Sequence, residues 1–260
     1  MRSAALRKYI GLFVAALLSL YLPGAAAQSA AGDDALAPYR DTGLAAKIAG
    51  RKPVATWVRG VVAYPSGDDS PSWYVDSERR VVGTRDGLFE LKRGKLMAMS
   101  KADTRAQQRR LAARTEVPPS HIRVFGDPAA TDRRELLLFT AFDCGPCREL
   151  EEVLQRRGDE LKIELHYLFD SLDNDEATQQ QLRNVQCAAK PFAAFERLAD
   201  GDSVPATPHC TIPLYATGYA ITLLGAPYVP YLIDRHSGQA LHWDGDEDAL
   251  IEALNGETAE

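Results

Sequence analysis

Two cysteines separated by two residues, Cys144-Gly145-Pro146-Cys147, are the part of the sequence best suited to chemistry. They follow an apolar run at residues 136–139 and precede a helical pattern that begins at Pro146. At a helix N-terminus, unpaired N–H groups and the helix dipole favour an anion, so the pKa of Cys144 should fall below the free value of about 8.5. We expect Cys144 to attack disulfides as a thiolate, and Cys147, one turn further along the helix, to resolve the mixed disulfide.

Zinc binding and an inert structural bridge are the other common uses of such a pair. Zinc is disfavoured because the sequence has no second Cys-x-x-Cys and no histidine at ligand spacing. A structural bridge is disfavoured because a four-residue loop between a strand and a helix is a poor staple. The motif therefore predicts thiol–disulfide exchange, without a metal or an organic cofactor.

The segments around the motif alternate between strand and helix patterns. The expected strands and helices lie at residues 136–139, 146–157, 161–169, 176–198, 214–224, 231–233, 241–243 and 247–254. The apolar run at 136–139 is typical of a strand that is buried on both faces. This order of elements predicts a thioredoxin core with an additional helical insert.

The first half of the chain contains no cysteine and has different patterns. A short helix is expected at residues 35–48, and short strands separated by turns at residues 54–97, including one strand at 56–62. Ser100 can cap a polar helix that runs to about Thr115, and so polar a helix usually bridges domains or lies on a surface.

We therefore expect an α+β protein in three parts after its leader. They are a small strand-rich N-terminal domain at 28–99, a linker helix and arm at 100–130, and a thioredoxin-like catalytic domain at 131–260.

The N-terminus has the three parts of a secretory signal peptide. Three basic residues precede an apolar run at 10–22, and Ala25-Ala26-Ala27 offers a cleavage site, so residues 1–27 should be removed. An uncleaved anchor is the alternative, but the apolar run is short for a membrane span and ends at Pro23-Gly24. Export would place the cysteines where disulfides persist.

The charge excludes one class of partner. The chain has a formal net charge of -6 at pH 7, and removal of the basic leader makes it more negative. An acidic protein has no electrostatic basis for binding nucleic acid.

The landmarks of the second half resemble the DsbC/DsbG family of periplasmic disulfide isomerases. The resemblance covers residues 135–245 and is carried by Phe139 through Cys147, Cys187-Ala188-Ala189-Lys190, Cys210, and Leu224-Gly225 leading to Pro230. Weaker similarity at Trp73-Tyr74-Val75-Asp76 and Gly87-Leu88-Phe89-Glu90 points to the family's dimerisation domain.

Two positions depart from the related patterns. The family more often has an aromatic residue at the place of Pro146, so the redox poise stays open. Leu138 stands where thioredoxins keep a buried acid, which argues against a plain thioredoxin.

The resemblance also implies roles for residues outside the motif. It implies a structural disulfide between Cys187 and Cys210, with a second redox relay as the alternative reading of that pair. It further implies a cis-proline that faces the cysteines and positions substrate. Pro230 is preferred to Pro227, because a cis-Pro227 would leave Pro230 inside a central strand.

Residues beside this proline are candidates for substrate binding. Val229 would pair with the substrate, and Tyr228 and Tyr231 could line a peptide groove, although aromatic residues beside a strand more often belong to the core. His166 lies on an expected strand and should be packed rather than catalytic.

The function implied by the resemblance is isomerisation or reduction of wrong disulfides in exported proteins in the periplasm. The implied partners are a second copy, joined through residues 54–97, and a membrane thiol reductase of the DsbD type. Two alternatives stay open: a monomeric periplasmic reductase with a narrow client, for example in cytochrome maturation, and a redox-inert chaperone or binding protein.

Overall fold

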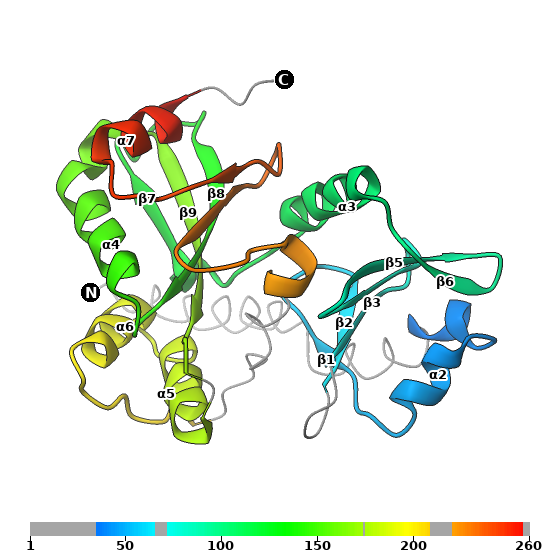
Figure 1. Ribbon diagram of the computed structural model, residues 1–260. Coiled ribbons are helices and arrows are strands. Elements are labelled where there is room, and N and C mark those ends of the chain that lie inside the picture. The colour runs from blue at the N-terminus through cyan, green and yellow to red at the C-terminus, as the bar shows by residue number, and fades with distance from the viewer. Residues whose placement is uncertain (1–34, 66–71, 174, 209–219, 257–260) are drawn as a thin grey trace, which may run out of the picture.

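The computed structural model describes residues 35–65, 72–173, 175–208 and 220–256, which form two units side by side (Figure 1). The expected signal peptide, Cys210 and most of the expected helix at 214–224 lie outside these ranges. None of the helices within them has the length and apolar character needed to cross a bilayer.

The N-terminal unit is built on a six-stranded antiparallel sheet whose strands follow one another in chain order. Its strands are β1 (Val54–Ala55), β2 (Val61–Tyr64), β3 (Trp73–Asp76), β4 (Val81–Thr84), β5 (Gly87–Lys92) and β6 (Lys95–Ala98). The single strand expected at 56–62 is wrong, because the chain turns between β1 and β2, where Gly60 has a φ of 79°.

One face of this sheet is covered by residues near the N-terminus. They form the 3-10 turn η1 (Ala37–Tyr39) and the helix α2 (Gly43–Ile48), rather than one helix over 35–48. Tyr39, Leu44 and Ile48 pack against Val75 and Val82 in a separate core.

Helix α3 (Lys101–Ala113) covers the other face together with the short helical segment η5 (Ala220–Leu224). The Ser100 side chain caps α3 by accepting the Asp103 N–H. Leu223 packs closely over Gly83, where a Cβ atom would lie 2.3 Å from the Leu223 Cδ2. A side chain at position 83 would therefore force Leu223 to shift.

The second unit contains a five-stranded sheet in the order β11-β10-β8-β9-β7. Only β8 and β9 run parallel among the described pairs. The strands are β7 (Ile122–Phe125), β8 (Arg134–Ala141), β9 (Ile163–Asp170), β10 (Tyr231–Asp234) and β11 (Ala240–Leu241).

Helices pack on one face of this second sheet. They are α4 (Gly145–Arg157), α5 (Glu176–Gln186), α6 (Pro191–Ala199) and α7 (Glu247–Asn255). The 3-10 turn η2 (Pro119–His121) precedes β7, and the 3-10 turn η3 (Gly158–Glu160) connects α4 to β9. The unit has a thioredoxin-like fold, and the α+β prediction is confirmed. The strand expected at 241–243 is shorter and ends at Leu241.

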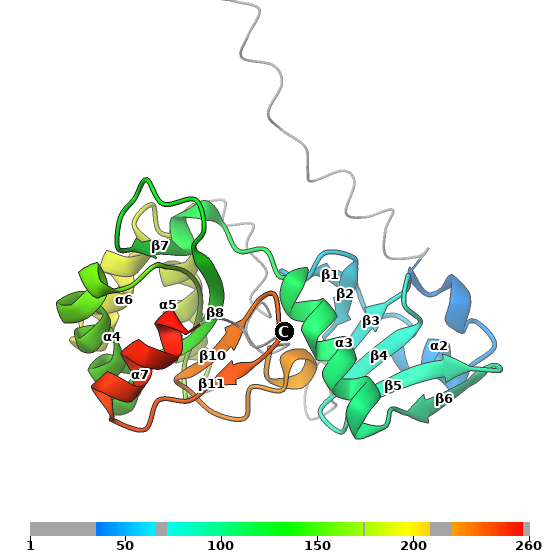
Figure 2. The same ribbon diagram turned by 90° about the horizontal axis from the view of Figure 1, so that it is seen from above.

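The opposite face of the second sheet has no helix of its own in the described chain and packs against the N-terminal unit. Leu137, Phe139 and Tyr231 share one core with Val58 and Leu111. Seen from above, α3 lies between the two sheets (Figure 2). The units therefore share a core instead of being held apart.

The chain expected as a linker helix and arm at 100–130 packs against both units. Thr115 forms a β-bridge with Val58, and its carbonyl accepts a hydrogen bond from Arg235 of the second unit at 2.7 Å. Residues 122–125 form the edge strand β7, so the second unit begins before residue 131. Few apolar residues of α3 point inward, but Leu111 and Ala112 are enough to anchor it.

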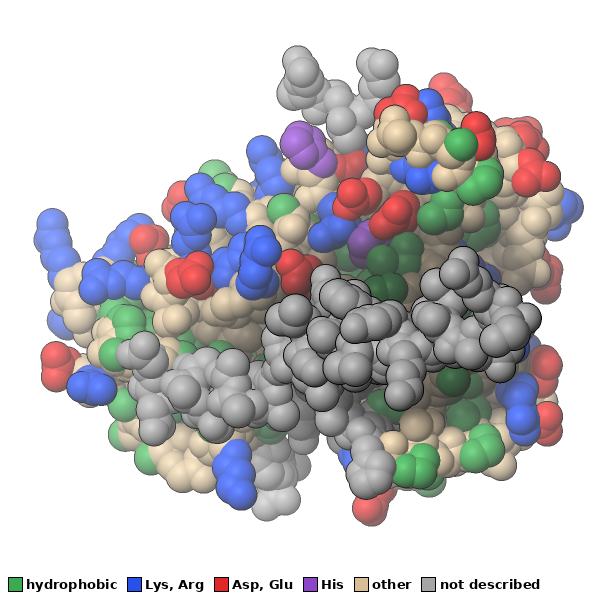
Figure 3. All heavy atoms as spheres, turned by 180° about the vertical axis from the view of Figure 1, so that it is seen from behind, with side chains coloured by type: hydrophobic (Ala, Val, Ile, Leu, Met, Phe, Trp, Pro, Cys, Tyr) green, Lys and Arg blue, Asp and Glu red, His purple; other side chains and the backbone are tan. Residues whose placement is uncertain are grey.

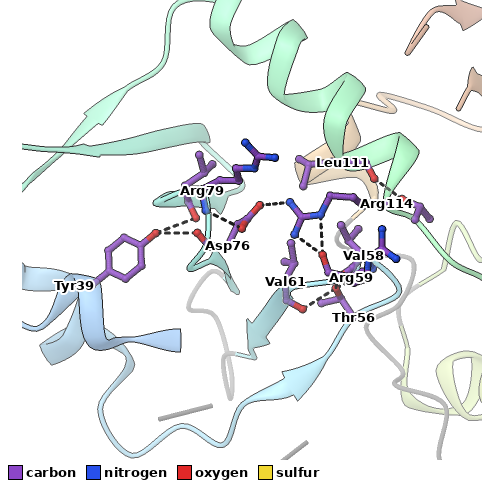
Figure 4. Close-up of polar contacts among 11 residues, drawn as sticks. Tyr39, Thr56, Val58, Arg59, Val61, Asp76, Arg79, Leu111 and Arg114 are labelled. Carbon is purple, nitrogen blue, oxygen red and sulfur yellow. Dashed lines mark hydrogen bonds and ion pairs between the residues drawn. The ribbon is translucent and has the colours of Figure 1, made fainter. Parts of the chain in front are cut away.

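A buried ion pair strengthens the attachment of α3 to its sheet (Figure 4). The Arg114 guanidinium lies 2.6 Å from the Asp76 carboxylate, and its Nε donates to the Arg59 carbonyl at 2.9 Å. Asp76 also accepts the Arg79 N–H. These contacts join the C-terminus of α3 to β3 and to the turn before β2.

Candidate active site

Cys144 and Cys147 form a disulfide at the start of α4. Cys144 is the N-cap residue, and its sulfur accepts the Cys147 backbone N–H at 3.2 Å. Pro146 occupies the first turn, where a missing N–H leaves no intrahelical bond unmade. The same N–H group would stabilise a Cys144 thiolate after reduction.

Both cysteine residues are buried in the disulfide form. The exposed fraction is 4% for Cys144 and 1% for Cys147, and both pack against Ala141 and Val229. Because Cys144 is the more accessible of the two, the geometry suits it to the first attack and Cys147 to resolution.

The loop before β10 faces the disulfide. The Val229–Pro230 peptide bond is cis, and the Val229 carbonyl oxygen lies 3.7 Å from the Cys144 sulfur. Among the described prolines, Pro230 alone follows a cis bond, so Pro227 does not have this geometry. Tyr231 then begins β10 and pairs with Phe139 of β8.

Of the two tyrosines beside Pro230, only Tyr228 is on the surface. Its exposed fraction is 48%, and its hydroxyl lies 2.5 Å from His242 Nδ1. Tyr231 is buried in the shared core, which corrects the expectation that it lines a groove. His242 was missed from the sequence, although its position just after β11, which pairs with β10, is the signal that places it beside Tyr228.

Asp143, which directly precedes Cys144, ties the motif to the loop after β9. Its carboxylate accepts hydrogen bonds from the Ser171 hydroxyl and the Leu172 N–H at 2.9 Å, and from the Asp173 N–H at 3.1 Å. These bonds hold the exposed Leu172 side chain close to the cysteine loop.

Two further carboxyl groups near the site are largely buried. Burial raises the pKa of Asp170 to about 6, and the charge of Asp143 acts in the same direction. Burial also raises the pKa of Glu151, which lies one turn after Cys147 on α4. Glu151 is compensated by Arg123 at 3.1 Å and accepts a hydrogen bond from Tyr167.

The remaining expected site residues lie elsewhere. Cys187 is the C-cap of α5, and since Cys210 is outside the described residues, their pairing stays a prediction. His166 is buried, and burial together with the Arg235 charge lowers its pKa to about 4. It is a packed residue, as the sequence indicated.

The charges differ between the two units. Basic side chains gather over the N-terminal unit, whereas Asp and Glu side chains are frequent around α7 (Figure 3). In residues 115–260 acidic residues outnumber basic ones, so the cysteine pair sits on the acidic unit.

The chain matches no protein-family model and no curated protein. Among solved structures, it is similar to the disulfide interchange protein from Neisseria gonorrhoeae, with 15% sequence identity and a TM-score of 0.40. The similarity covers 53% of this chain and 96% of the other.

Proposed function

We propose that the protein is a thiol:disulfide oxidoreductase that reduces and isomerises wrong disulfides in exported proteins. The observation that carries the proposal is the Cys144–Cys147 disulfide at a helix N-terminus, with the cis-peptide before Pro230 against the Cys144 sulfur. A purely structural bridge would need neither the helix N-terminus nor the facing carbonyl.

The reaction follows from the positions of the two sulfurs. In the reduced protein, the Cys144 thiolate attacks a substrate disulfide, forms a mixed disulfide and releases one substrate thiolate. Cys147 then loses its proton and attacks the Cys144 sulfur, which restores the internal disulfide and releases the second substrate thiolate. The substrate gains two electrons, and the Cys144–Cys147 pair loses two.

Substrate binding is proposed at the loop before Pro230. The Val229 backbone lies beside the attacking sulfur, where an extended peptide can pair with it as an added strand. Tyr228 adds an exposed aromatic ring next to this backbone, and His242 fixes the position of that ring. We expect a peptide segment next to the target cysteine to contact Tyr228.

The assembly proposed for an isomerase is a homodimer joined through the N-terminal unit. Strand β6 is at the edge of its sheet, and the exposed fraction of Met97 on it is 52%. An unpaired edge can bind the same edge of a second copy around a two-fold axis. The proposed setting is the periplasm, where a membrane thiol reductase of the DsbD type would return the pair to its reduced form.

One observation favours the second candidate, a monomeric reductase with a narrow client. Helix α3 is docked and the two units share a core, so α3 does not form a free arm beside a wide cleft. Light scattering at micromolar concentration decides between the candidates, because an isomerase of the proposed kind is dimeric. Refolding of a scrambled multi-disulfide protein gives the matching activity readout.

The chemistry is tested by two cysteine variants. Cys144→Ala should abolish reduction of insulin disulfides, and Cys147→Ala should retain the first attack and accumulate mixed disulfides. Peptide mapping after brief alkylation of the reduced protein at pH 7 should find the label on Cys144. Preferential labelling of Cys147, or full activity in Cys144→Ala, would contradict the proposal.

A further inference from the structure

Asp170 is the last residue of β9 and carries a carboxyl group that the exchange reaction above does not use. The parallel register of β8 and β9 places it directly beside Ala141. Ala141 in turn packs against Cys144, Cys147 and Val229. Since neighbouring strands are about 4.8 Å apart, the carboxyl group lies within roughly 10 Å of the disulfide.

The Asp170 side chain also points to the side of the sheet that carries Ala141. Paired residues on adjacent strands share a face, and the alternation along β8 puts Phe139 and Ala141 on the same face. Phe139 belongs to the core that contains Tyr231, which follows the cis-proline. The carboxyl group therefore lies on the face from which the Val229 loop approaches the disulfide.

The negative charge of Asp170 has little compensation. Its Oδ1 accepts the Ser171 backbone N–H at 2.9 Å, and no cation of the described chain forms an ion pair with it. The charged group that faces it is Asp143, which has the same sign and raises the Asp170 pKa together with burial.

The two other acids near the motif differ from Asp170 in this respect. Asp143 spreads its charge over hydrogen bonds from the Ser171 hydroxyl and from two backbone N–H groups. Glu151 forms an ion pair with Arg123. Asp170 is the acid near the cysteines whose charge is both desolvated and unpaired within the described residues.

We propose that the Asp170 carboxylate makes the Cys144–Cys147 pair a stronger reductant by destabilising negative charge on the Cys144 sulfur. When the Cys144–Cys147 pair is reduced, its sulfur–sulfur bond breaks. The two electrons come from a dithiol donor, which becomes a disulfide. Cys147 takes up a proton, while Cys144 keeps a negative charge. A nearby carboxylate repels that thiolate and has no charge to repel in the disulfide, so it favours the oxidised form.

This inference rests on the proposed exchange function and adds the direction in which the pair transfers electrons. A pair that readily gives up its electrons suits reduction and isomerisation, in which the resting protein must be a dithiol. An oxidase needs the opposite, a strongly stabilised thiolate.

The test uses Asp170→Asn, with Asp159→Asn as the matched control. Asp159 is an exposed acid just after α4, about 20 Å from Cys144 along the 13-residue helix, and its variant makes the same change in net charge. The midpoint potential is measured in dithiothreitol redox buffers at pH 8. The pKa of Cys144 is measured from the pH dependence of alkylation.

Asp170→Asn should lower the pKa of Cys144 by about one unit. The tenfold gain in the stability of the reduced form raises the midpoint potential by about 30 mV. The potentials of the variant and the wild type should converge below about pH 6, where the Asp170 carboxyl is protonated. Asp159→Asn should match the wild type at every pH. Asp170→Glu should bring the midpoint potential and the pKa of Cys144 back toward the wild-type values.

Equal potentials and equal Cys144 pKa values in Asp170→Asn and Asp159→Asn would overturn the inference. A lower melting temperature of Asp170→Asn with both redox values unchanged would also overturn it, because the role would then be structural only. A wild-type protein with no reversible dithiol–disulfide couple would instead remove the proposed function itself.

Discussion

Replacing Asp76 by Asn should strongly destabilise the N-terminal unit, because this carboxylate balances a buried cation. The exposed fraction of the Asp76 side chain is 3%, and that of Arg114 is 14%. Asn keeps the size of the side chain and an oxygen that can accept the Arg79 N–H, so the change removes the charge without leaving a cavity.

The expected loss of stability depends on the interactions that Arg114 keeps in the variant. Its guanidinium still donates to the Arg59 carbonyl, but its positive charge loses the only carboxylate partner that it has in the described chain. Removing one member of a buried ion pair costs about 3–5 kcal/mol, and the remaining amide oxygen offsets part of that. We expect Asp76→Asn to lower the free energy of unfolding by about 2–4 kcal/mol.

The assay is equilibrium unfolding in urea, with the Cys144–Cys147 disulfide intact and with low and high salt compared. Glu116→Gln is the control, because Glu116 pairs with Arg59 at 3.2 Å on the surface, where the side chains are 60% and 71% exposed. An exposed pair of this kind contributes at most about 1 kcal/mol and weakens with salt. The buried pair should respond little to salt.

A double-mutant cycle isolates the interaction. Arg114→Met alone should also destabilise the protein, whereas Asp76→Asn should cost less when Arg114 is already replaced. If Asp76→Asn costs no more than Glu116→Gln, the ion pair between Asp76 and Arg114 does not fix α3 to the sheet.

Three further predictions concern packing, pH and substrate contact. Gly83→Ala should destabilise the protein by about 1–3 kcal/mol in urea because the new methyl group overlaps Leu223, whereas Gly43→Ala, which has open space, should not. Asp170→Asn should raise the stability at pH 7 by up to about 3 kcal/mol in thermal or urea unfolding, because burial raises the pKa of Asp170 in the folded protein from its ordinary value of 3.8 to about 6. The wild type therefore loses stability as pH rises through 6, and the advantage of the variant should vanish below pH 3.8. A variant no more stable than the wild type at pH 7 would contradict this burial. Tyr228→Ala should raise KM for peptide disulfides several-fold with the rate toward dithiothreitol unchanged; an equal loss toward both would place Tyr228 in the fold rather than in the binding surface.

Local rules predicted that the cysteine pair lies at the start of a helix, and it does. The apolar strand followed by Cys144-Gly145-Pro146-Cys147 is a short-range pattern, and a proline in the first turn restricts how the helix can begin. The choice of Pro230 over Pro227 used another local rule, that a central strand does not accept proline. These rules depend on backbone geometry within a few residues, so the features that they describe can be predicted from the sequence.

The packing of helix α3 could not be predicted from such local rules. Its composition suggested a solvated connection, yet two apolar residues at its C-terminus, Leu111 and Ala112, and the ion pair to Asp76 anchor it. Nothing within the helix reveals that the partners of Arg114 are Asp76 and the Arg59 carbonyl, 38 and 55 residues away. The same holds for β7, a four-residue strand that is recognisable once β9 is beside it.

The sequence by itself determined the position of the cysteine pair, the helix that begins at it and the α+β class, and together with the family resemblance it selected Pro230. The tertiary structure alone decided that the two units share a core, that Tyr231 is buried while Tyr228 is exposed, and that Asp170 lies beside the cysteine cluster. The reason is physical: a motif and a helix cap are fixed by neighbouring backbone atoms, whereas burial and the strength of a charge depend on groups that the fold brings from distant parts of the chain.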